Sequence, residues 1–80
     1  MTITASNDLG DLPKRFGTRL TEERERLGLA VHQLAHNVGI TDYKQKRLEN
    51  GSSVISIDYL QALSVSSSEI DILYIITGTR

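Results

Sequence analysis

The sequence predicts an all-α fold, and three observations lead to this prediction. Apolar residues recur at helical spacing in several segments, with polar residues between them. Glycine or a serine-rich stretch follows these segments, which is where helices commonly end. No segment shows the sustained alternation of apolar and polar residues that is typical of strands. Because the chain has 80 residues, we expect one small domain with a single core.

The first helix is predicted over residues 13–27. Pro13 suits the first turn of a helix, and Gly28 suits the position just after its end. Between them, one face carries Phe16, Leu20 and Leu27. Residues 1–12 are polar and lack helical periodicity, so we expect a flexible arm there and a domain over 13–80.

Two short helices are predicted next, joined by a tight turn. One covers about residues 30–37, and Gly39 interrupts its pattern. Thr41 is a good N-cap residue, so the following helix is expected from Asp42 to Glu49. Two short helices joined by a turn that contains glycine match a helix-turn-helix unit.

Two further helices complete the predicted fold. The fourth begins near Ser56 and ends at the serines 66–68, with an inward face made of Ile57, Leu60 and Leu63. Ser66 and Glu69 have the spacing of a capping box, which predicts a fifth helix over 67–77 that ends at Gly78.

Composition excludes several classes of protein. Without cysteine there is neither a disulfide framework nor a thiolate metal site. The longest apolar stretch, Ile70 to Ile76, is interrupted by Asp71 and is too short to span a membrane. The first residues do not form a secretory signal, so a cytoplasmic location is expected. No phosphate-binding glycine loop, nucleophile elbow or pocket-forming carboxylate pair is present, so we expect neither an enzyme nor a cofactor.

The net charge of −1 gives no sign of a general polyanion binder. Residues 13–80 carry nine basic and eight acidic residues. If the chain binds nucleic acid, it must therefore do so through a local basic patch.

Four short motifs, taken in order, carry a resemblance to a known family. They are Gly28-Leu29, Leu34-Ala35, Gly39-Ile40-Thr41 and Leu48-Glu49-Asn50-Gly51. Together they resemble the phage-repressor (lambda-repressor-like, xenobiotic-response-element) helix-turn-helix family, over about residues 14–80. The closing segment, residues 71–80, resembles the end of members carried by phages and prophages. The resemblance implies five helices, sequence-specific binding of double-stranded DNA, and homodimers that act as transcriptional repressors on two-fold operators.

The resemblance makes residues 42–49 the recognition helix. It implies that Arg47 forms a bidentate fork with guanine and that Lys44 and Lys46 neutralise phosphates. Tyr43 would donate to phosphate or pack on a thymine methyl. The full set of implied DNA-binding residues is Thr41, Asp42, Tyr43, Lys44, Lys46, Arg47, Asn50 and His32. The alternative for the basic residues is an ordinary solvated helix face.

The chain departs from the family pattern at three places. Ala30 and Val31 stand where a serine cap and a glutamine are common, so a cap and a phosphate contact are missing. Gln45 occupies a position that is usually aliphatic and inward, which a satisfied buried amide would explain. Asp42 favours the helix dipole but repels phosphate, although it can accept from cytosine N4.

Two pairs of side chains have expected structural roles. In the family, an arginine late in the first helix commonly meets the glutamate before Asn-Gly, which implies an ion pair between Arg24 and Glu49. The alternative is two unrelated surface charges. His32 and His36 are four residues apart, but no cysteine or third histidine completes a metal site, so no metal is expected.

The last helix is apolar on more than one face. A short terminal helix buries only one stripe against its own domain, so the surplus predicts a dimer interface. Its candidate residues are Ile72, Tyr74, Ile75 and Ile76. The alternative is a helix inserted deeply into the core.

The leading expectation is a dimeric, DNA-binding phage or prophage repressor. The alternative is that the same fold serves as a protein-interaction module, such as an adaptor or the target of an antirepressor or another phage protein. Asp42, Val31 and the near-neutral charge favour this alternative, whereas the basic residues after Tyr43 favour DNA.

Overall fold

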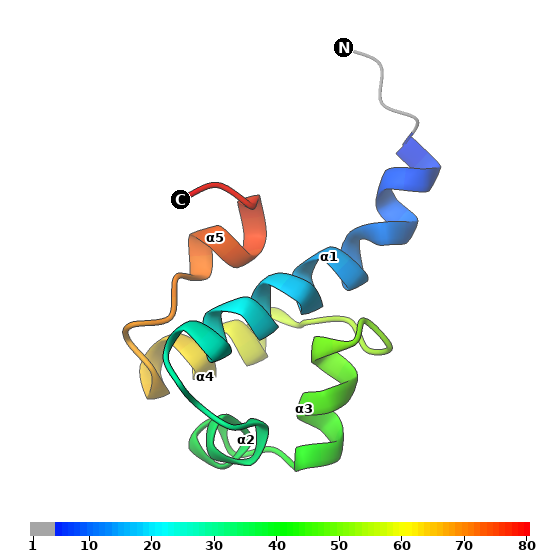
Figure 1. The fold of residues 1–80 in the computed structure, drawn as a ribbon. Helices are drawn as coiled ribbons and strands as arrows, with labels where there is room; N and C mark the ends of the chain where they lie inside the picture. Colours follow the sequence, from blue (N-terminus) through cyan, green and yellow to red (C-terminus); the bar gives the residue numbers. More distant parts are fainter. Residues whose placement is uncertain (1–4) are drawn as a thin grey trace.

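The computed structural model describes residues 5–80, and their side chains from residue 14 onward. Within residues 5–80 the chain is all-helical and contains no strand. The five helices are α1 (Ala5–Arg26), α2 (Val31–Val38), α3 (Asp42–Glu49), α4 (Ile57–Ser66) and α5 (Ile72–Thr77) (Figure 1). None of these helices is both long enough and apolar enough to cross a membrane, as far as the described residues extend.

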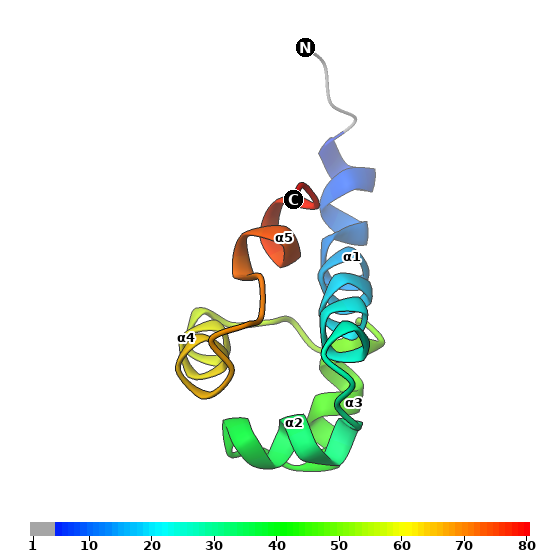
Figure 2. The same cartoon turned by 60° about the vertical axis from the view of Figure 1, so that its left-hand side comes forward.

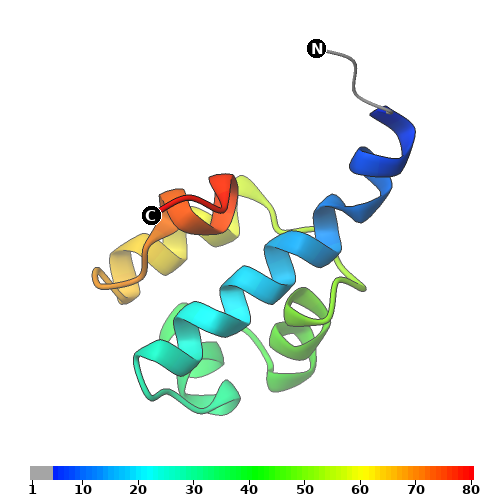
Figure 3. The ribbon, with the colours of Figure 1, turned by 45° about the horizontal axis from the view of Figure 1, so that its top comes forward.

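The first helix begins at Ala5, earlier than the predicted start at Pro13. Residues 5–12 are therefore helical, although their composition predicted an arm; residues 1–4 lie outside the described part of the chain. Pro13 therefore lies inside α1, where its fixed φ is compatible with a helix but its missing N–H removes one backbone hydrogen bond. Figures 1 and 3 show the amino-terminal part of α1 extending beyond the other helices.

The last helix is shorter than predicted, because its cap is not the predicted one. Ser66 ends α4, and the chain turns inward so that Ile70 is buried. Asp71 caps α5 instead, since its carboxylate accepts from the Tyr74 N–H at 2.9 Å. The helix then ends at Gly78, as predicted.

The helices pack around one core. α1 packs against both α3 and α5, and α2 packs against both α3 and α4. In Figures 1 and 3, α5 and α3 lie on opposite sides of α1, and Figure 2 shows α2 running across one end of the molecule. The buried apolar cluster takes residues from every helix: Leu20, Leu34, Leu48, Tyr59, Leu63, Ile70 and Ile75.

The inward face of α4 differs from the prediction. Leu63 is buried as expected, but Ile57 in the first turn is 78% exposed. Tyr59 lies inward together with Leu63, and its hydroxyl donates to the buried Gln45 on α3.

Candidate nucleic-acid interface

The third helix has one buried and one exposed face. Gln45 and Leu48 are buried, whereas Asp42, Tyr43, Lys44 and Lys46 are exposed. The exposed face therefore carries two lysines and an aromatic ring that is 68% exposed. Thr41, just before the helix, is also exposed. Five of the eight residues that the resemblance implied for DNA binding are therefore exposed here: Thr41, Asp42, Tyr43, Lys44 and Lys46.

Local hydrogen bonds fix where this helix begins. The Thr41 hydroxyl accepts from the Lys44 N–H at 3.1 Å, which confirms the predicted N-cap. Asp42 follows in the first turn, where a carboxylate is favourable to the helix dipole. The tight turn before Thr41 contains Gly39 at φ 93°, a left-handed conformation that side chains other than glycine rarely adopt.

The loop after α3 lies beside Lys14 of α1. Asn50 accepts from the Ser52 N–H through its side chain at 2.8 Å, so this amide shapes the loop. Gly51 lies against the backbone of Lys14, whose side chain is exposed. Lys14 thus adds a cation beside the loop, a placement that depends on how α1 crosses α3 and has no signal in the sequence.

Arg47 is engaged within the protein. Its guanidinium donates to the Ser53 hydroxyl at 3.0 Å, to the Ser52 carbonyl at 3.2 Å and to the Tyr43 hydroxyl at 3.3 Å. The group also lies over the Tyr43 ring, 5.8 Å from its centre. A fork to guanine would have to compete with these contacts.

The second helix presents both of its histidines to solvent. His32 and His36 are exposed, and His32 lies near the beginning of the helix. Ala30 offers no side-chain cap, but the Gln33 side chain accepts from the Ala30 N–H at 2.7 Å. Gln33 thereby replaces part of the missing cap. Among the described residues, no group of three or more His, Cys, Asp or Glu side chains could hold a metal ion.

A buried polar network anchors α3 to α1. Arg24 and Glu49 form the predicted ion pair through two hydrogen bonds of 2.9 and 3.0 Å, and Arg24 also donates to the Leu29 carbonyl at 2.8 Å. The side chains of the pair are only 12% and 9% exposed. Gln45 continues the network: its amide donates to Glu49 at 2.8 Å and its carbonyl accepts from Tyr59 at 2.7 Å.

These contacts explain the unusual residue on the inner face of α3. Gln45 is fully buried and every polar atom of its side chain has a partner, so it is a satisfied buried amide. Burial raises the pKa of the Tyr59 hydroxyl, which therefore stays protonated and donates to Gln45. The buried face of α3 is consequently held in place by a fixed set of hydrogen bonds.

Gly17 allows α1 to approach the carboxyl end of α3 closely. A Cβ at this position would lie 2.5 Å from the carbonyl oxygens of Leu48 and Glu49. Any larger side chain would push the two helices apart. The close approach brings Glu49 within reach of Arg24 and Thr21, which both donate to it.

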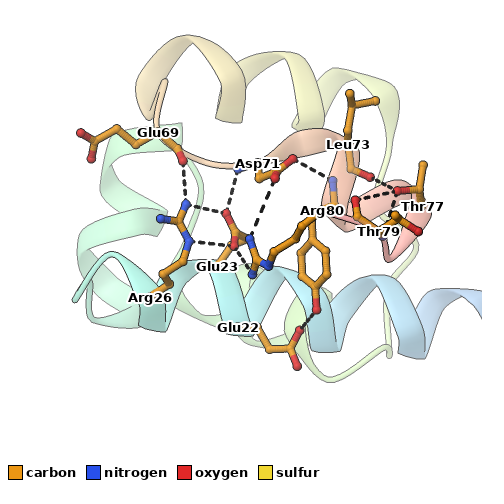
Figure 4. A network of polar contacts seen from close by, with 10 residues as sticks. Glu22, Glu23, Arg26, Glu69, Asp71, Leu73, Thr77, Thr79 and Arg80 are labelled. Carbon is orange, nitrogen blue, oxygen red and sulfur yellow. Dashed lines mark hydrogen bonds and ion pairs between the residues drawn. The ribbon is translucent and has the colours of Figure 1, made fainter.

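A second polar network fixes α5 to α1, and it has no signal in the sequence. Glu23 is fully buried and accepts from Arg26, from Arg80 and from the Asp71 N–H (Figure 4). The hydrogen bond from Arg26 does most to lower the pKa of Glu23, from its ordinary 4.5 to about 2, against the opposing effect of burial. The carboxylate is therefore charged at neutral pH and joins α1 to the segment before α5.

The final residues fold back along α5. Arg80 stacks on the Tyr74 ring at 3.9 Å from its centre and bonds Glu23 at 2.8 Å. The Tyr74 hydroxyl donates to Glu22 on α1. Tyr74 is therefore turned toward its own domain, although the sequence analysis assigned it to a dimer interface.

The predicted dimer residues separate into two groups. Ile75 is 1% exposed and belongs to the core, so assigning it to a free surface was wrong. Ile72 is half-buried and packs against the same core cluster. Ile76 is 44% exposed and its neighbour Leu73 is 69% exposed, so the free apolar surface of α5 consists of these two residues. The sequence alone does not show that Leu73 points outward, because helical periodicity gives its direction only when an inward residue, here Ile75, is known.

Comparison with known proteins gives no match to a family model, to a curated protein or to a solved structure.

Proposed function

We propose that the chain binds double-stranded DNA sequence-specifically and acts as a phage or prophage transcriptional repressor. In this proposal α2 and α3 form a helix-turn-helix within a lambda-repressor-like domain, and α3 is the recognition helix. The observation that carries the proposal is the division of α3 into a buried face and an exposed one with Tyr43, Lys44 and Lys46. Recognition helices of this kind enter the major groove with their first turns.

Each exposed residue then has a role that its chemistry supports. Lys44 and Lys46 neutralise phosphates, and this contribution does not depend on sequence. Asp42 accepts from cytosine N4, and Tyr43 meets the DNA beside it. Asn50 and His32 approach the phosphate backbone from the loop and from α2.

A single recognition helix reads only a few base pairs, so we propose that two copies bind two half-sites. Leu73 and Ile76 on α5 are the apolar surface available for pairing them. Since Ile75 is in the core, the proposed interface is narrower than the apolar content of α5 suggested.

The second candidate function is a protein-interaction module, for example the target of an antirepressor. Two observations favour it: Asp42 places a negative charge on the exposed face, and Arg47 is already bonded within the protein. In this case the exposed face of α3 would contact a protein partner, and DNA binding would be weak or absent.

A salt titration separates the two functions. The equilibrium constant for binding a mixed-sequence duplex is measured from low to moderate salt. DNA binding through several phosphates predicts a steep linear fall of log K with log salt, with a slope of about −0.9 per phosphate. Lys44→Ala should reduce that slope by about one contact while leaving base preference unchanged. No binding of the unsubstituted protein even at low salt would reject the first function in favour of the second.

A further inference from the structure

Arg47 joins two parts of the proposed interface. Its contact to Tyr43 reaches back to the first turn of α3, and its contacts to Ser52 and Ser53 reach forward to the loop. The Arg47 carbonyl also accepts from the backbone N–H groups of Ser52 and Ser53, at 2.9 and 3.1 Å. The side chain and backbone of one residue thus hold the loop against the helix.

The contact with Tyr43 has a consequence for its hydroxyl. Because the oxygen accepts from Arg47, the hydroxyl hydrogen remains available to donate outward. A hydroxyl that accepts from a charged donor is polarised and becomes a stronger donor in turn. Tyr43 is 68% exposed and lies on the open side of α3.

We propose that Arg47 acts on DNA through Tyr43, as a positioning residue, and that the Tyr43 hydroxyl is the group that donates to DNA. The acceptor is an oxygen or nitrogen atom of the duplex, either on a phosphate or on a base edge. This inference rests on the proposed DNA-binding function. It replaces the direct guanine fork that the family resemblance implied for Arg47.

A double-mutant cycle tests the inference. Binding of a selected duplex is measured for Tyr43→Phe, Arg47→Ala and the double variant. If Arg47 acts through the hydroxyl, each single variant weakens binding about tenfold and the double variant loses no more than either. Arg47→Lys should lose as much as Arg47→Ala, because lysine keeps the charge but lacks the planar fork.

Lys46 provides the matched control, since it is an exposed cation on the same helix. The losses from Tyr43→Phe and Lys46→Ala should multiply, because neither residue acts through the other. Multiplying losses for Tyr43 and Arg47 would overturn the inference, and so would full binding by Arg47→Lys.

Base preference identifies the acceptor. If Tyr43→Phe weakens all duplexes equally, the acceptor is a phosphate; if it flattens the preference at one base pair, the acceptor is a base edge. In either case Arg47→Ala should have the same profile as Tyr43→Phe. A base pair whose preference is lost in Arg47→Ala but kept in Tyr43→Phe would contradict the inference and support the guanine fork.

A measurement on the protein without DNA separates a failure of this inference from a failure of the proposed function. The Arg47 Nε–H donates to Ser53, so its exchange with water should be slow and should accelerate in Ser53→Ala. Unchanged exchange would show that the hydrogen bond from Arg47 to Ser53, which orients the guanidinium, does not exist in solution, and would overturn the inference. If the exchange result holds but no duplex binds, this hydrogen bond stands, and both the proposed function and the action of Arg47 on DNA are rejected.

Discussion

The buried charges show what a single residue contributes to this fold. Glu23 stands in the charged run from Glu22 to Arg26, and nothing in the sequence separates it from its neighbours. Its burial depends on two partners far along the chain, Asp71 and Arg80, which the sequence alone does not bring to it. In contrast, the ion pair between Arg24 and Glu49 could be predicted from the sequence through its resemblance to a known family.

Glu23→Gln should destabilise the protein by about 3 kcal/mol at neutral pH, since it removes the buried carboxylate that neutralises the Arg26 and Arg80 guanidinium groups. The pH dependence follows from the lowered pKa of Glu23, about 2 in the folded protein against 4.5 ordinarily. A depressed pKa stabilises the folded state above pH 4.5, and this contribution is lost as the pH falls toward 2.

Chemical denaturation between pH 2 and 7 measures this contribution. The unsubstituted protein should lose stability over the acid range, whereas Glu23→Gln should show a flatter profile there. Glu25→Gln is the control, because Glu25 is an exposed carboxylate on the same helix. Equal effects of the two substitutions would refute the structural role of Glu23.

At the scale of the elements, the sequence predicted the helices that have strong local signals. α3 has the predicted bounds because Thr41 caps it and the residues after Glu49 end it. The predicted start of α5 was wrong, because both Ser66 and Asp71 are possible N-caps in the sequence and the structure uses Asp71, just after the buried Ile70. The predicted start of α1 was also wrong, because the polar residues before Pro13 are helical in spite of their composition.

The crossing of α1 and α3 leads to a prediction about Gly17. Alanine ordinarily stabilises a helix relative to glycine, but here its Cβ would lie 2.5 Å from two backbone carbonyls. We therefore expect Gly17→Ala to destabilise the protein by roughly 1–3 kcal/mol, the usual cost of overpacking. Thermal or denaturant unfolding measures the change.

Thr18→Ala is the matched control for the crossing, because Thr18 is the next residue of α1 and is exposed. It should change stability by no more than about 0.5 kcal/mol. If Gly17→Ala proved neutral or stabilising, the close contact between the two helices would be disproved.

At the scale of the whole molecule, the proposed dimer depends on which side of α5 is free. Ile76→Glu places a charge on the exposed side, so the variant should fold but pair weakly. Ile75→Glu places the charge in the core, where an unpaired carboxylate is costly, so it should lose helicity. Sedimentation and circular dichroism on the two variants distinguish these outcomes.

Three results would contradict the proposed assembly. A folded Ile75→Glu variant would mean that α5 does not insert into the core. Unsubstituted protein that stays monomeric at high concentration, or an Ile76→Glu variant that pairs normally, would remove α5 as the interface.

Selection from a random duplex pool is the decisive experiment on the proposal that the exposed face of α3 reads a DNA sequence. Bound duplexes are recovered, amplified and sequenced over several rounds, with Lys44→Ala/Lys46→Ala protein as the comparison. We expect two related half-sites about 10 base pairs apart, centre to centre, because two paired recognition helices require this spacing. The double variant should recover the same sequence with lower affinity, because phosphate contacts position the protein without specifying bases. A pool that remains random after selection with the unsubstituted protein would contradict the claim.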